Sequence, residues 1–148
     1  MIQTTRDDFE VWLADMDDAL ERFKDQLPDD VRSRLDYSAD SLDVVESWIL
    51  SHYQDNLELL DRKESTSLDG LSRYVGEVFR KNLRAKWDIE LKNQKDAYFG
   101  LPKLVGYSDS LNAECPLSLV TASANRRKGT FLSSVLRNMM KRFRPKQK

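Results

Sequence analysis

The chain has 148 residues, of which 40% are hydrophobic and 33% are charged, a balance typical of a globular protein and not of a disordered chain. The single cysteine excludes an internal disulfide, and the scarcity of glycine and proline favours helices over a turn-rich β fold. No apolar run reaches the roughly 20 residues that a membrane helix needs, and the N-terminus has no signal-peptide pattern. We therefore expect a cytoplasmic protein.

The net charge of −1 conceals a division along the chain. Residues 1–70 contain 19 acids and 7 Lys or Arg, whereas residues 71–148 contain 6 acids and 17 Lys or Arg. Such a division predicts either two surfaces of opposite charge or two halves that pack together and neutralise each other.

Residues 5–27 carry the clearest helical pattern. Apolar residues recur every three or four positions, at Phe9, Leu13, Met16, Leu20, Phe23 and Leu27. Thr5 is suited to cap the N-terminus, and Pro28 ends the pattern. We expect one helix, with this stripe in the core and with Asp15, Asp18, Glu21 and Asp25 on the outer face.

Further helices are expected at 40–52 and 67–84, with a short one within 29–39. In the segment 67–84 the apolar residues share one face, while Arg73, Glu77, Arg80 and Lys81 fall on or toward the opposite face. We expect Glu77 to pair with Lys81 one turn on, and Gly76 to let another element approach closely.

The second half of this helix contains a short motif that continues into a predicted strand. Residues 74–77 read Tyr-Val-Gly-Glu, and Arg80, Leu83 and Trp87 follow. This arrangement resembles a family of uncharacterised small bacterial proteins that have a Tyr-x-Gly-Glu pattern, a downstream Arg and a Trp that enters a strand. The resemblance implies a bacterial protein with a helix-to-strand unit here, and it implies no particular activity.

From Trp87 onward the spacing of apolar residues changes from the helical period of 3.6 residues to the strand period of 2. Alternation covers residues 87–91 and, after a polar connection at 93–96, residues 97–101, where Pro102 follows. Residues 103–107 are a candidate third strand. These patterns predict an α+β fold: a mostly helical single domain, residues 1–145, with a small antiparallel β-hairpin or three-stranded sheet packed on helix 67–84. Residues 146–148 are expected to be a frayed basic tail.

Two helices are expected after the sheet. Pro116 suits the first turn of a short helix, and Thr130 is expected to cap the last one, 130–144. The periodic patterns together predict a largely buried core made of Phe9, Leu13, Met16, Leu20, Phe23, Trp48, Val75, Val78, Phe79, Ile89, Phe99, Leu136 and Met139.

Few side chains indicate catalysis. His52 and Cys115 are the only histidine and cysteine, and the sequence has no zinc-type spacing, Gly-rich phosphate loop or nucleophile motif. We expect no cofactor and no metal site. His52 is expected to be a partly buried helical residue with one hydrogen bond.

Two functions from different classes fit this inventory. The first is that of a non-enzymatic bacterial protein that binds another protein, possibly a basic one, through the acidic helical face formed by Asp15, Asp18, Glu21 and Asp25, as immunity proteins do by analogy. The alternative is nucleic-acid binding through the basic C-terminal helix and the segment before it, by Arg126, Arg127, Lys128, Arg137, Lys141 and Arg144. The large surplus of acids in residues 1–70 favours the first.

Overall fold

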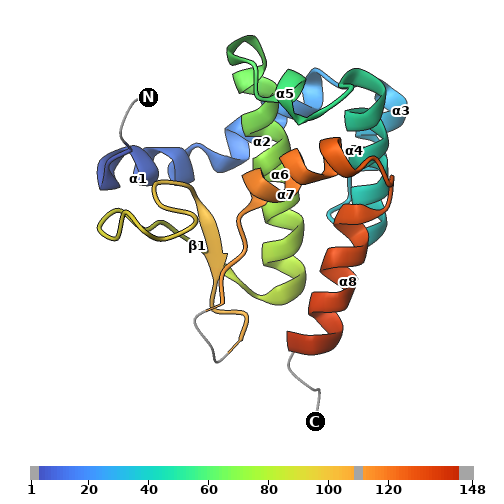
Figure 1. The fold of residues 1–148 in the computed structure, drawn as a ribbon. Coiled ribbons are helices and arrows are strands. Elements are labelled where there is room, and N and C mark those ends of the chain that lie inside the picture. The colour runs from blue at the N-terminus through green and yellow to red at the C-terminus, as the bar shows by residue number, and fades with distance from the viewer. Residues whose placement is uncertain (1–3, 109–111, 144–148) are drawn as a thin grey trace.

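The computed structural model describes residues 4–108 and 112–143, and these form eight α-helices, a 3-10 turn and a two-stranded antiparallel sheet (Figure 1). In chain order the helical elements are α1 (Arg6–Ala14), α2 (Met16–Asp25), α3 (Asp29–Arg32), α4 (Ala39–His52), α5 (Asn56–Leu59), η1 (Arg62–Glu64), α6 (Ser65–Leu83), α7 (Pro116–Arg126) and α8 (Phe131–Phe143). The strands are β1 (Lys86–Asp88) and β2 (Lys103–Val105), between α6 and α7. The expected mostly helical α+β fold is therefore confirmed, with the smaller of the two expected sheets. The basic tail expected at 146–148 lies outside the described residues.

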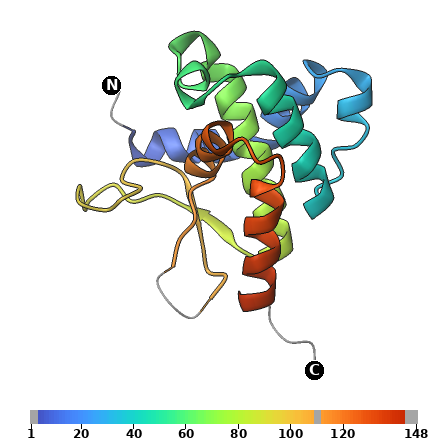
Figure 2. The same ribbon diagram turned by 45° about the vertical axis from the view of Figure 1, so that its right-hand side comes forward.

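Helix α6 occupies the centre of the fold, and α2, α4, α7 and α8 all pack against it (Figures 1 and 2). All ten residues from Gly70 to Phe79 are buried, so this part of the helix is enclosed on every side. The expected polar outer face of this helix is therefore wrong for Arg73 and Glu77, which are both buried. Ten of the thirteen predicted core residues are buried, whereas Leu13, Trp48 and Phe99 are only half-buried.

The expected single helix at 5–27 is two helices. The backbone leaves helical geometry at Asp15, where φ is −84° and ψ is 2°, and α2 begins at the next residue. The capping of α1 by Thr5 is confirmed, because its side chain accepts a hydrogen bond from the Asp8 amide. The break lets α2 pack against α6 while α1 continues beside β1 (Figure 1).

The strand expected at 97–101 does not form, and the candidate third strand at 103–107 supplies the partner of β1. Residues 97–101 form turns, because Gly100 has a positive φ of 74° and donates its amide to the carbonyl of Glu90. The strand that pairs with β1 is β2, which places Trp87 opposite Leu104. Leu104 also forms an isolated bridge with Glu114, so a third segment only touches the sheet.

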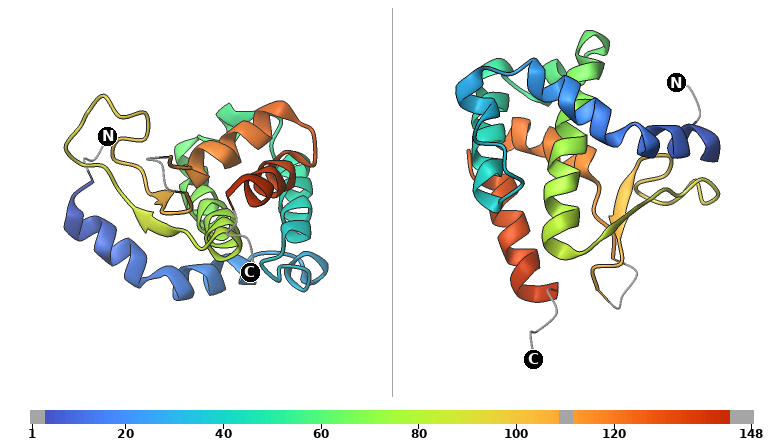
Figure 3. Two further views of the ribbon diagram at one scale, coloured as in Figure 1. Left: turned by 90° about the horizontal axis from the view of Figure 1, so that it is seen from below. Right: turned by 180° about the vertical axis from the view of Figure 1, so that it is seen from behind.

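The acidic and basic halves neutralise each other in part. Helix α8 packs along α4, where Arg137 forms an ion pair with Asp40 and the Ser133 hydroxyl donates to Asp43 at 2.6 Å. Helices α2 and α8 lie on different sides of α6 (Figure 3). The carboxylates of α1 and α2 therefore belong to helices that lie apart from the basic helix α8.

No helix within the described ranges combines the length and the apolar character needed to cross a bilayer.

Three tyrosines are expected to make the stability of the fold fall at alkaline pH. Burial is the largest cause that raises the pKa of Tyr53, Tyr74 and Tyr107 to about 12, from an ordinary value of 10.0. Their stabilising contribution is fully present below pH 10, where the three hydroxyls are protonated in both the folded and the unfolded chain. It is lost as the pH rises through about 12, because the unfolded chain ionises first.

We therefore expect the urea concentration at the denaturation midpoint to decrease as the pH is raised from about 10 to about 12. The tyrosinate absorbance of these residues in the folded protein should increase at a higher pH than in the unfolded chain. Tyr107→Phe keeps the ring that contacts Phe143 but removes one ionisable group, so its midpoint is expected to fall less steeply. A midpoint that is independent of pH over this interval would contradict the assignment.

Candidate functional site

The residues of the Tyr-Val-Gly-Glu motif and its downstream Arg and Trp meet where α6 faces β1. A Cβ atom on Gly76 would lie 2.1 Å from Cη2 of Trp87, so the glycine lets the indole ring lie directly against the helix. The indole Nε1 of Trp87 donates to Glu77 at 3.0 Å. The close approach expected at Gly76 is thus confirmed, and Trp87 is the side chain that makes it.

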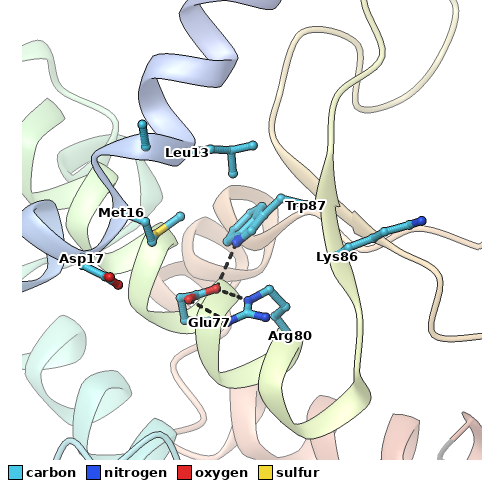
Figure 4. Close-up of a pocket in the computed structure, with 8 residues that line it drawn as sticks. Leu13, Met16, Asp17, Glu77, Arg80, Lys86 and Trp87 are labelled. Carbon is cyan, nitrogen blue, oxygen red and sulfur yellow. Dashed lines mark hydrogen bonds and ion pairs between the residues drawn. The ribbon is translucent and has the colours of Figure 1, made fainter.

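Glu77 pairs with Arg80 and not with the expected Lys81. Both carboxylate oxygens accept from the guanidinium, at 2.5 Å and 3.1 Å (Figure 4). The Glu77 side chain is 7% exposed and that of Arg80 is 35% exposed, so the carboxylate is buried while the guanidinium is partly open to solvent. The hydrogen bond from Glu77 is the largest cause that raises the pKa of Arg80 above its ordinary value. Lys81 lies over the ring of Tyr37 instead.

A second set of three residues repeats this arrangement two turns earlier on α6. Trp12 of α1 donates its Nε1 to Asp69 at 2.8 Å, and Arg73 donates its Nε to the other oxygen of Asp69 at 2.7 Å. The Arg73 guanidinium also lies over the Trp12 ring and donates to the Trp12 carbonyl. This second set ties α1 to α6, as the first set ties β1 to α6.

The two sets form one tryptophan cluster, consisting of Trp12, Asp69, Arg73, Glu77, Arg80 and Trp87. Its halves meet at the tryptophans, whose rings contact edge to face with centroids 4.9 Å apart. Within the cluster each carboxylate is bound by one arginine and one indole N–H. Such a network holds its members in fixed positions, and it orients α1 relative to β1.

An open pocket of about 380 Å³ borders the cluster on the side of Glu77 and Arg80. Leu13, Ala14 and Met16 form its apolar wall, and the charged side chains of Asp17, Arg80 and Lys86 complete the lining together with Glu77 and Trp87 (Figure 4). A second pocket, of about 530 Å³, is lined by Val11, Trp12, Asp15 and Arg73 among others. Ala14, the last residue of α1 before the break, lines both pockets.

The structure places the four predicted acidic residues on the outer side of α1 and α2. Asp18, Glu21 and Asp25 are exposed, and Asp15 is half-buried at the break between the helices. Three of them have cationic neighbours in the same chain: Asp15 contacts Arg22 at 2.6 Å, Glu21 contacts Lys24 at 3.7 Å, and Asp25 contacts Arg32 at 3.4 Å. Among the described residues Asp18 has no ion pair.

The predicted basic residues do not form one free surface. Arg127 donates its guanidinium to the backbone carbonyls of Leu50, Tyr53 and Gln54, so it caps the C-terminal end of α4. Arg137 is paired with Asp40, and Arg126 lies over the ring of Phe131.

The other predicted basic positions are more open. Lys128 and Lys141 are exposed, and Arg144 lies outside the described residues. The basic surface available to a partner is therefore smaller than the sequence indicates.

His52 and Cys115 occupy different settings. His52 is exposed, which corrects the expected partial burial, and its Nδ1 lies 2.8 Å from the Trp48 carbonyl while its ring stacks on that of Trp48. Cys115 is fully buried at the start of α7. Within the described ranges, no group of three His, Cys, Asp or Glu side chains is placed to hold a metal ion.

Sequence reasoning missed half of the tryptophan cluster. The sequence patterns singled out neither Trp12 nor Asp69 as a site residue. The available signal was the spacing of Asp69 and Arg73 by four positions on a predicted helix, which is typical of an intrahelical ion pair. Their partner Trp12 lies 57 positions away from Asp69, and no local pattern indicates that contact.

Comparisons of the chain with protein families, with curated proteins and with solved structures find no match.

Proposed function

We propose that this chain is a non-enzymatic cytoplasmic bacterial protein that binds a basic protein through its acidic face. The acidic face combines the four residues predicted from the sequence, Asp15, Asp18, Glu21 and Asp25, with the other carboxylates of α1 and α2, namely Asp7, Asp8, Glu10 and Asp17. All except the half-buried Asp15 are exposed. The same two helices and their break contain only three cations, Arg6, Arg22 and Lys24. This exposed surplus of negative charge carries the proposal, because complementary potentials speed association with a basic partner and suppress wrong partners.

An exposed valine gives the acidic face an apolar centre. Val11 is 69% exposed, and Asp7 and Asp15 lie one helical turn before and after it. Val11 also borders the pocket of about 530 Å³ described above. Protein interfaces commonly combine an apolar centre with a polar rim, so the arrangement fits a partner that presents an apolar side chain among Lys and Arg residues.

The tryptophan cluster supports a binding role because it holds α1 in place. Arg73 is 3% exposed and joins Trp12 to Asp69, so α1 is anchored from its inner side. A surface that is already ordered loses less conformational entropy on binding. The carboxylate of Asp69 is engaged in this anchoring.

Charge reversal tests the proposal. The variant Asp18→Lys with Glu21→Lys changes two exposed carboxylates, of which only Glu21 has an ion pair, a long one at 3.7 Å. We expect a partner captured from the source cell by the wild type to be a basic protein, and we expect the variant to bind the purified partner at least about tenfold more weakly. The measurement is the dissociation constant at low and at physiological salt.

The matched control carries the same charge change elsewhere. In Asp30→Lys with Asp61→Lys, both altered side chains are exposed and lie outside α1 and α2. This control is expected to bind as the wild type does. Equal binding by both variants would contradict the proposal, and so would turnover of a small molecule by the wild type. Retention of the wild type on immobilised DNA or RNA at low salt would instead favour the nucleic-acid alternative through helix 130–144.

A further inference from the structure

The pocket of about 380 Å³ beside Glu77 and Arg80 combines an apolar wall with charges of both signs. Its volume lies within the usual range of about 300–1,000 Å³ for small-molecule sites. The carboxylate of Glu77 is already bound by Arg80 and by the indole N–H of Trp87. The other charged groups of the lining belong to Arg80, Asp17 and Lys86, and these decide which ligand the pocket suits.

Arg80 offers hydrogen-bond donors to this pocket. Its Nε and one N–H of its Nη2 bind Glu77. A guanidinium has five N–H groups, so three remain, and none of these has an acceptor within the described part of the chain. The Arg80 side chain is 35% exposed and lines the pocket, so a ligand is able to reach it. Two N–H groups of a guanidinium are well suited to a carboxylate.

Asp17 supplies the opposite charge. It is exposed at the start of α2, and among the described residues it takes part in no ion pair. The pKa of Arg80 is raised mainly by the hydrogen bond to Glu77 and in smaller part by the charge of Asp17. Asp17 therefore lies within electrostatic reach of the guanidinium without pairing with it. The side chain of Lys86 extends away from Arg80, so Lys86 contributes mainly its aliphatic stem (Figure 4).

This arrangement of charges favours a ligand that carries both signs. An anion bound at Arg80 would be repelled by Asp17, and a cation bound at Asp17 would be repelled by Arg80. A zwitterion avoids both costs, because each of its charged groups meets the opposite charge. Its apolar part has a surface to cover, since Leu13 and Met16 lie on one side of the pocket and Glu77 and Arg80 lie on another (Figure 4).

We propose that this pocket binds a free α-amino acid with an aliphatic side chain, such as leucine. The carboxylate of the amino acid accepts hydrogen bonds from Arg80, its ammonium group donates to Asp17, and its side chain packs against the apolar wall. Charge-assisted hydrogen bonds of about 2.8 Å at each end let a compact zwitterion bridge two groups that are too far apart to pair directly. Asp17 also belongs to the acidic face, but this site does not depend on the proposed protein partner.

NMR titration with L-leucine tests the site, because the protein contains three tryptophans and each has its own indole N–H signal. We expect leucine to shift the signal of Trp87, which lines the pocket. The signal of Trp48 is the internal control, since Trp48 stacks on His52 and lies outside this lining. Glycine has both charges but no side chain, and it is expected to bind at least about tenfold more weakly than leucine.

Two derivatives of leucine each remove one charge. N-acetylleucine lacks the ammonium group and leucinamide lacks the carboxylate, so each is expected to bind at least about tenfold more weakly than leucine. The two derivatives also resemble the C-terminal and the N-terminal residue of a peptide. They therefore distinguish a site for a free amino acid from a site for one end of a protein chain.

A variant tests the role of Asp17. Asp17→Asn replaces an exposed carboxylate by an amide of similar size, and it is expected to abolish the preference for leucine over N-acetylleucine. Asp30→Asn is the matched control, because Asp30 is also exposed but lies on α3, outside this pocket. The control is expected to bind leucine as the wild type does. An unchanged Trp48 signal in the free variants shows that the fold is intact.

Four results would overturn the proposal. The first is the absence of a shift at Trp87, and the second is an equal shift at Trp48. The third is binding of N-acetylleucine, leucinamide or glycine as tightly as leucine. The fourth is an unchanged preference for leucine over N-acetylleucine in Asp17→Asn, because the ammonium group would then be bound elsewhere.

Discussion

Replacing Glu77 by alanine is expected to lower the free energy of unfolding by about 2–4 kcal/mol. The substitution leaves the Trp87 indole N–H without its acceptor and removes the counterion of Arg80. The Arg80 side chain is 35% exposed and is able to turn toward water, so the loss is smaller than for a fully buried pair. The measurement is denaturation in urea, with the indole signal of Trp87 as a local reporter.

Two controls separate the role of Glu77 from the general effect of removing a carboxylate. Glu77→Gln keeps an acceptor for Trp87 but loses the charge, so a smaller loss of about 1–3 kcal/mol is expected. Glu10→Ala removes one partner of an ion pair whose side chains are 57% and 61% exposed, and it should change stability by less than about 1 kcal/mol. If Glu77→Ala is as mild as Glu10→Ala, the cluster does not hold β1 on α6.

The stability of the tryptophan cluster and the proposed binding function are separable by experiment. Asp18 and Glu21 point away from the cluster and are exposed, so their reversal is expected to alter binding while leaving the unfolding midpoint nearly unchanged. Glu77→Ala alters stability, and it affects binding only if the anchoring of β1 also influences α1 through the contact between Trp12 and Trp87.

Features that depend on neighbours in the sequence were the ones that could be predicted. The period of the apolar residues predicts α6 and α8 and the burial of Val75, Phe79 and Leu136. The cap of α1 by Thr5 is a contact over three positions. The contacts of the motif around Gly76 are also local in sequence, because Glu77, Arg80 and Trp87 lie within eleven consecutive positions.

Features that depend on contacts between distant segments could not be predicted. The break at Asp15 separates α2, which packs against α6, from α1, whose Trp12 contacts both Asp69 of α6 and Trp87 of β1. Residues 97–101 form turns in place of the expected strand, and the amide of Gly100 donates to the carbonyl of Glu90, ten positions earlier. The apparent polar face of α6 is buried at Arg73 and Glu77, which bind Trp12 and Trp87 from two other elements.

The N-terminus of α8 is a further contact of this long-range kind. The sequence predicts capping by Thr130, but the carboxylate of Glu46 on α4 accepts hydrogen bonds from the amides of Phe131 and Leu132, at 3.0 Å and 2.8 Å. Glu46 is fully buried, and it lies 85 positions before Phe131. A carboxylate at this position compensates both the unpaired amides and the positive end of the helix dipole. It also joins the acidic half of the chain to the basic half.

Replacing Glu46 by alanine is therefore expected to cost about 3–5 kcal/mol, because each of two amides then lacks a partner and each unpaired buried group costs about 1–3 kcal/mol. Glu46→Gln retains one acceptor oxygen but turns an amide N–H₂ toward the second backbone amide, so an intermediate loss is expected. Hydrogen exchange at Phe131 and Leu132 should accelerate in Glu46→Ala relative to the centre of α6. If Glu46→Ala were as stable as the wild type, the two amides would have found other partners, and α4 would not cap α8.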